Sequence, residues 1–142
     1  MSKIVIVDDD PQMSCLLRTL FELEGFEVVV AQRYQDILPT IQQARPDAVL
    51  MDVRVQGRET LDLVRQMRQE RALTDIPVVM TSGMDYRRQC LEAGANCFLM
   101  KPFIPDEVVQ TIGTLLKPAE SSIRCPFNES GSDDSFVVRH GA

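Results

Sequence analysis

Three carboxylates stand in a row near the start of the chain, where Asp8, Asp9 and Asp10 directly follow the apolar run Lys3–Val7 (KIVIV). Carboxylates packed this closely repel one another and raise one another's pKa, so such a cluster is usually kept where a cation lies against it. Carboxylate oxygens with no nearby Cys or His favour Mg²⁺, or Mn²⁺, over zinc. The sequence therefore predicts a divalent-cation site at the end of this run.

Three further polar residues each end an apolar run: Asp52 after AVLM, Ser82 after IPVVMT, and Lys101 after CFLM. If these runs are neighbouring parallel strands, about 4.8 Å apart, Asp9 and Asp52 can share one divalent ion with ligand distances of about 2.1 Å. An ammonium group and a hydroxyl beside that ion would offset charge on a transferred phosphoryl group. This set of groups suits phosphoryl transfer to an aspartate.

The apolar runs themselves are short, rich in Val and Ile, and nearly continuous, as expected of parallel strands that are covered on both faces. Segments with helical spacing of apolar residues separate them. Five β-α repeats predict an open parallel sheet with helices on both faces, whose active crevice lies outside the carboxyl ends of the strands. The predicted strands are residues 3–7, 26–31, 47–52, 76–82 and 97–101.

Helix boundaries are indicated by individual residues. Asp10 before Pro11 is a strong helix start, so we expect Asp10 to cap a helix rather than bind metal. Gly25 and Gly94 are expected to end helices. Pro39 is expected in or near the first turn of the second helix.

Composition excludes several classes of protein. The chain has 142 residues, 44% of them hydrophobic, which suits one globular domain. Its net charge of -6 and pI near 4.7 argue against direct contact with nucleic acid or an anionic membrane. No apolar stretch approaches the roughly 20 residues needed for membrane insertion. Four cysteines without C-x-x-C spacing, and no signal sequence, favour a cytoplasmic protein with free thiols.

The motifs IVIVDDD, VLMDV, PVVMTSG and FLMKPF, in this order and spacing, resemble the receiver domain of bacterial two-component response regulators. The resemblance covers residues 3–117 and implies a flavodoxin-like α/β fold with five parallel strands in the order 2-1-3-4-5. We therefore expect a receiver domain over residues 1–117. Residues 118–142, rich in Ser, Gly and acidic residues, are expected to form a flexible tail.

The same resemblance implies roles for individual residues. One group comprises the phosphoacceptor Asp52, the metal-binding Asp8 and Asp9, the backbone carbonyl of Val53 as a further ligand, and the family's lysine, Lys101. The other is the switch, with Ser82 as its hydroxyl and Phe98 as its rotating aromatic. We prefer Ser82 to Thr81 because Thr81 is expected on the opposite side of its strand, and because Gly83 follows Ser82.

The predicted function is that of a single-domain response regulator. Its only histidine, His140, lies in the tail, so the phosphoryl donor would be a sensor histidine kinase, a histidine phosphotransfer protein or a small acyl phosphate. The phosphorylated form would bind a downstream protein, and a homodimer is allowed for. The protein would catalyse its own phosphorylation without being an enzyme in the turnover sense.

Two alternatives remain open. One is a phosphorylation-independent pseudo-receiver that only binds proteins; Gln56, which replaces the family's usual proline, and the short segment between Ser82 and Lys101 keep it open. Gln56 also predicts a less rigid loop after Asp52. The other is a phosphatase of the haloacid dehalogenase type. That family has an aspartate two residues after its nucleophile, and Arg54 at this position argues against it.

Overall fold

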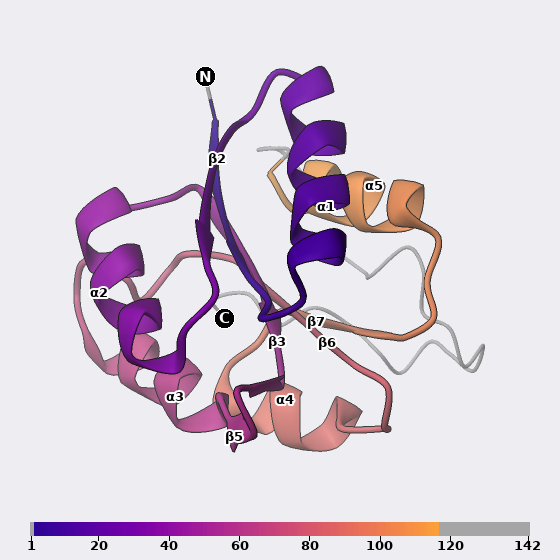
Figure 1. Ribbon diagram of the computed structural model, residues 1–142. Coiled ribbons are helices and arrows are strands. Elements are labelled where there is room, and N and C mark those ends of the chain that lie inside the picture. The colour runs from indigo at the N-terminus through magenta and orange to yellow at the C-terminus, as the bar shows by residue number, and fades with distance from the viewer. Residues whose placement is uncertain (1, 117–142) are drawn as a thin grey trace.

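Five parallel strands form one sheet in the computed structural model, which describes residues 2–116 (Figure 1). They are β1 (Lys3–Val7), β2 (Glu27–Ala31), β3 (Ala48–Asp52), β6 (Val78–Ser82) and β7 (Cys97–Met100). Their spatial order is β2-β1-β3-β6-β7, with every neighbouring pair parallel. This is the predicted flavodoxin-like order 2-1-3-4-5, so the predicted fold class is confirmed.

Helices cover both faces of this sheet. They are α1 (Pro11–Leu23), α2 (Tyr34–Ala44), α3 (Leu61–Gln69), α4 (Arg87–Ala93) and α5 (Pro105–Leu115). α1 and α5 pack together on one face, and α2, α3 and α4 lie on the other, with α3 against α4 (Figure 1). Because both faces are covered, every residue of the central strand β3 is buried, which explains its continuous apolar run.

Local signals mark some of the helix ends. The Asp10 carboxylate accepts hydrogen bonds from the backbone N–H groups of Gln12 and Met13, at 3.0 and 3.4 Å, so Asp10 caps α1 as predicted. Gly94 ends α4 with φ of +118°, a conformation that favours glycine. Pro39 differs from the prediction: it lies inside α2, beyond the first turn, and it is exposed.

A small antiparallel hairpin follows β3, where the sequence indicated a less rigid loop. Its strands are β4 (Arg54–Val55) and β5 (Arg58–Glu59). The two turn residues, Gln56 and Gly57, both have positive φ, +54° and +78°, as a type I′ hairpin turn requires. Hydrogen bonding thus orders the segment directly after the predicted phosphoacceptor.

Three other expectations can be placed. The predicted tail, residues 118–142, lies outside the described residues. Cys15 and Cys90 are free thiols, but Cys97 is disulfide-bonded, so the expectation of free thiols throughout is wrong. Within residues 2–116, no helix is both long and apolar enough to cross a membrane.

Candidate functional site

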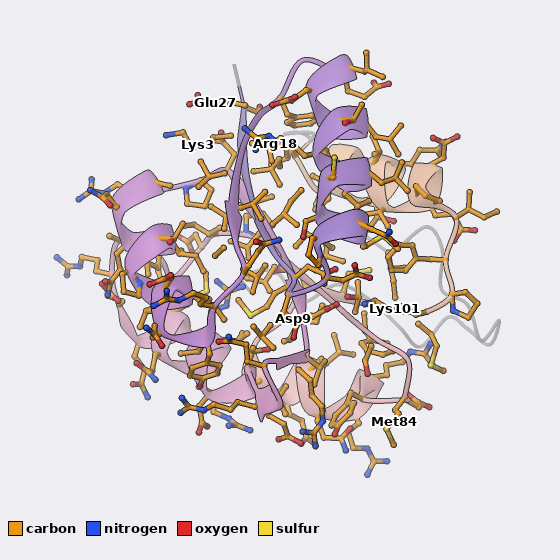
Figure 2. The ribbon with its side chains drawn as sticks, in the orientation of Figure 1. Lys3, Asp9, Arg18, Glu27, Met84 and Lys101 are labelled. Carbon is orange, nitrogen blue, oxygen red and sulfur yellow. The ribbon has the colours of Figure 1, made fainter. Side chains whose placement is uncertain are left out.

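The predicted acidic residues meet at the carboxyl ends of the strands. Asp8 and Asp9 follow β1, Asp52 ends the neighbouring strand β3, and one carboxylate oxygen from each lies within 4.8 Å of the others. Lys101 follows β7 and lies at the same end of the sheet as Asp9, opposite Lys3 (Figure 2). The topology therefore brings together groups from three strand ends that are far apart in the sequence.

Asp52 is the most engaged of the three carboxylates. Its side chain is buried, and the Lys101 ammonium lies 3.0 Å from Oδ1 and 3.2 Å from Oδ2. The Thr81 hydroxyl donates a hydrogen bond to Oδ1 at 2.5 Å, and the Thr60 hydroxyl donates to the Asp52 backbone carbonyl at 2.7 Å. These contacts fix the orientation of the carboxylate and leave it beside a positive charge.

Asp8 is a buried carboxyl group with little compensation for its charge. Burial is the main cause that raises its pKa to about 7; a hydrogen bond from the Asp10 N–H opposes the shift, the nearby Asp52 adds to it, and the charge of Lys101 opposes it. A divalent cation between Asp8, Asp9 and Asp52 would favour the ionised form of Asp8. The donor set is made only of carboxylate oxygens, which fits Mg²⁺ or Mn²⁺.

Asp8→Asn is expected to stabilise the metal-free protein at pH 8 by about 5 °C in Tm and to have much less effect at pH 5. The pKa of Asp8 is about 7 in the folded protein, against 3.8 for an exposed aspartate, so the folded protein binds more protons than the unfolded chain between these pH values. Stability is therefore lost as pH rises through this window. Thermal unfolding in EDTA at pH 5 and pH 8 measures the Tm difference between Asp8→Asn and the wild type, with Asp10→Asn as the control. A Tm difference that does not change with pH would contradict the assignment.

Asp9 occupies the outer, exposed side of the cluster. Its Oδ2 accepts a hydrogen bond from the backbone N–H of Gln56, in the hairpin turn, at 2.8 Å. The third carboxylate of the cluster is thus positioned by a residue 47 positions away in sequence. Neither the predicted strand pattern nor the acidic motif indicated this contact.

The Val53 carbonyl, predicted as a metal ligand, is directed elsewhere. Its oxygen accepts hydrogen bonds from the Thr60 backbone N–H at 2.7 Å and from the Thr60 hydroxyl at 3.2 Å. The Thr60 hydroxyl has a single proton and lies nearer to the Asp52 carbonyl, so the Thr60 backbone N–H is the main donor to Val53. Because this carbonyl is already engaged by Thr60, the role of Val53 as a metal ligand stays a prediction.

The hydroxyl that reaches Asp52 belongs to Thr81, whereas Ser82 was predicted. Thr81 is paired in register with Asp52 on the neighbouring strand, so both side chains project on the same side. Ser82 projects the other way, and its oxygen accepts a hydrogen bond from the Met84 N–H at 3.0 Å. Knowledge of the register between β3 and β6 is needed to identify Thr81 as the residue whose hydroxyl contacts Asp52.

Phe98, predicted as the rotating aromatic, is fully buried on β7. It pairs with Met80 on β6, one residue before Thr81, and the Arg87 guanidinium lies 5.8 Å from the centre of its ring. The Lys101–Pro102 peptide bond that follows β7 is cis. Phe98 therefore lies on the strand next to that of Thr81, with its side chain on the opposite face of the sheet, and its predicted role as a switch stays a prediction.

Comparison with known proteins adds sequence evidence. The family model of the response regulator receiver domain matches residues 4–113. The chain is 34% identical to the transcriptional regulatory protein CpxR of Escherichia coli K12, covering 99% of this chain and 62% of CpxR. It is 30% identical to the phosphate regulon regulatory protein PhoB of Pseudomonas aeruginosa, covering 80% and 51%. The chain thus spans about half to three-fifths of these relatives.

Solved structures show the same fold. A putative response regulator from Chloroflexus aurantiacus superposes with a TM-score of 0.75 at 31% identity, over 81% of this chain and 97% of that one. The BeF₃-activated receiver domain of Klebsiella pneumoniae RstA gives a TM-score of 0.73 at 27% identity, over 81% and 98%. Together with the family match over most of its length, these similarities place the chain in the response regulator receiver domain family.

Proposed function

We propose that this receiver domain accepts a phosphoryl group on Asp52 in a Mg²⁺-dependent reaction. The observation that carries the proposal is the arrangement around Asp52: an ammonium group, a hydroxyl and two further carboxylates converge on one buried carboxylate. Asp8, Asp9 and Asp52 would hold the ion, and Mn²⁺ would serve in its place. When bound, the ion supplies positive charge to the transferred phosphoryl oxygens.

Asp52, Lys101 and Thr81 would have separate roles in the phosphoryl transfer. Asp52 Oδ2 attacks the phosphorus, an O–P bond forms, and the bond to the donor's leaving group breaks, giving an acyl phosphate. Because the transition state is loose and its charge is spread over the phosphoryl oxygens, catalysis depends on positioning and charge neutralisation. Lys101 is already within 3.2 Å of both Asp52 oxygens and would turn to a phosphoryl oxygen. Thr81 would donate its hydrogen bond to another.

The transfer would change the conformation through Thr81 and Phe98. Thr81, which now donates to Asp52, would move with the new phosphoryl oxygen. That movement would change the packing at the end of β6, beside β7, where Phe98 is buried, and would let the ring reorient. The surface formed by α4, β7 and α5 would change with it, as in other switches that couple a local charge to repacking.

The partners follow from the chemistry. The donor would be the phosphohistidine of a sensor histidine kinase or a histidine phosphotransfer protein, and the output would be contact with a downstream protein or a second copy of the chain. The curated relatives are transcriptional regulators, but the described residues form the receiver fold alone. We propose a signalling module rather than an enzyme with turnover, acting without direct contact with nucleic acid.

The test is intact mass after incubation with acetyl phosphate and Mg²⁺. One phosphoryl group is expected on the wild type with Mg²⁺, and none on Asp52→Asn or in EDTA. Acyl phosphate formation on Asp52→Asn would place the acceptor elsewhere. If the wild type neither gains mass from acetyl phosphate or a histidine kinase panel nor binds Mg²⁺, the pseudo-receiver function replaces this one.

Thr81 and Ser82 offer a matched pair of variants. Thr81→Ala is expected to slow phosphorylation of Asp52 by about tenfold or more, because it removes a positioned donor. Ser82→Ala is expected to leave the rate within about twofold, since its hydroxyl contacts the Met84 N–H instead. The mass-resolved time course measures both. The reverse ranking would restore the original assignment of Ser82.

A further inference from the structure

Gln56 contacts two parts of the molecule that are far apart in the sequence. Its backbone N–H donates to Asp9 Oδ2 in the acidic cluster at 2.8 Å. Its side-chain Oε1 accepts a hydrogen bond from the backbone N–H of Tyr34, the first residue of α2, also at 2.8 Å. One residue therefore contacts the candidate metal site through its backbone and a helix start through its side chain.

The start of α2 depends on this contact. The first backbone N–H groups of a helix have no partner within the helix and are usually capped by the preceding side chain. Arg33 occupies the capping position of α2, and its side chain makes no capping hydrogen bond. Gln56 supplies an acceptor for one of these groups from 22 residues away in the sequence.

The hairpin that contains Gln56 contacts a neighbouring element on each side. On one side, the Arg58 guanidinium lies 3.8 Å from the centre of the Tyr34 ring, a cation–π contact. On the other, the Tyr86 hydroxyl, just before α4, donates to Glu59 Oε2 at 3.1 Å. Movement of the β4–β5 hairpin would therefore change contacts at the beginnings of both α2 and α4.

The backbone of the turn fixes where Gln56 points. Its φ of +54° is unusual for a residue other than glycine, and both contacts of Gln56 are made in that conformation. Gly57, with φ of +78°, completes the turn, and Arg54 Nη1 donates to the Gly57 carbonyl at 3.2 Å. The hairpin is thus a defined element rather than a loose loop, and it can transmit a displacement.

We propose that Gln56 is a positioning residue of the metal site and couples the position of Asp9 to the start of α2. The inference rests on the proposed function, because it needs a divalent cation at Asp8, Asp9 and Asp52. An ion that draws the Asp9 carboxylate inward would carry the Gln56 N–H with it, because the two are hydrogen-bonded. The contact of the Gln56 side chain with the Tyr34 N–H then changes, and α2 responds to occupation of the site.

The chain provides its own reporters, because Tyr34 and Tyr86 are its only tyrosines and it has no tryptophan. The full chain would be labelled with 3-fluorotyrosine, and the two ¹⁹F resonances assigned with Tyr34→Phe and Tyr86→Phe. MgCl₂ would be titrated in parallel by ¹⁹F NMR and calorimetry, with KCl as the ionic-strength control. The Tyr34 resonance is expected to shift with the midpoint of the calorimetric binding curve.

Two substitutions separate positioning by Gln56 from general effects of the ion. Gln56→Asn keeps the backbone N–H and suits an Asn-Gly turn, but its shorter amide does not reach the Tyr34 N–H. The Mg²⁺-dependent shift of Tyr34 is expected to be lost in this variant. Gln56→Glu keeps an acceptor at the original length, and the shift is expected to return.

Three outcomes would overturn the inference. Calorimetric binding without a Tyr34 shift would show that Asp9 and α2 are independent. An equal shift in wild type and Gln56→Asn would show that the coupling does not pass through the Gln56 side chain. No calorimetric binding to the wild type would remove the metal site itself, and with it both the proposed function and this inference.

Discussion

Replacing Lys101 with methionine is expected to slow phosphorylation of Asp52 by about 100-fold, the usual effect of removing one positioned charge-stabilising group. The Lys101 ammonium lies 3.0 Å from Asp52 Oδ1, and the charge that develops on the phosphoryl oxygens would fall within its reach. Methionine keeps the apolar stem of the side chain and most of its length but removes the charge. The initial rate with acetyl phosphate and Mg²⁺, followed by intact mass, measures the effect.

A lysine at the opposite end of the sheet provides the control. Lys3 starts β1 and donates to the Ala44 carbonyl at 3.2 Å, far from the acidic cluster (Figure 2). Lys3→Met is therefore expected to leave the phosphorylation rate unchanged within about twofold. If Lys101→Met is phosphorylated as fast as Lys3→Met, the ammonium group has no part in the transfer, and its contact with Asp52 is only structural.

Much of the fold could be predicted because its determinants are local. Continuous apolar runs marked the parallel strands, since a strand covered on both faces has no polar side to alternate with. Asp10 marked the start of α1 because a carboxylate before proline can cap the first N–H groups. The topological rules for β-α repeats then placed the ends of β1, β3 and β7, with Asp52 and Lys101, at one edge.

The errors in the predicted site arise where strand register and loop geometry determine the direction in which a group points. The side chains of a strand alternate between two faces, so an error of one residue exchanges Thr81 for Ser82. That register is set by packing of β6 between β3 and β7, which the sequence of β6 alone does not contain. The direction of the Val53 carbonyl depends on Thr60, seven residues later, and is equally invisible in a local motif.

The hairpin after β3 was missed for a related reason. A Gln-Gly turn is a weaker signal than Asn-Gly, and two-residue strands are too short for a hydrophobic pattern. Its order comes from contacts made by Gln56, Arg58 and Glu59 with elements distant in the sequence. The sequence shows that Gln56 replaces the family's usual proline. It does not show that the Gln56 backbone N–H donates to Asp9, a hydrogen bond that a proline could not make.

Asp9→Asn is expected to weaken Mg²⁺ binding by at least about tenfold, whereas Asp10→Asn should leave it nearly unchanged. Even residues that only orient metal ligands typically cost 10- to 100-fold in affinity when mutated, so loss of a carboxylate in the cluster should cost about as much or more. Asp9 belongs to that cluster, while Asp10 directs its carboxylate to the Gln12 and Met13 N–H groups of α1.

The two adjacent substitutions are closely matched, because each replaces an exposed aspartate with its amide and removes one negative charge. Asparagine also caps helices about as well as aspartate, so Asp10→Asn should keep α1 intact. Titration calorimetry with MgCl₂ measures both affinities. Equal weakening by the two variants would mean that binding depends on the overall negative charge near β1. A selective loss with Asp9→Asn would mean that three consecutive carboxylates have separate tasks, set by the direction in which the end of β1 points each of them.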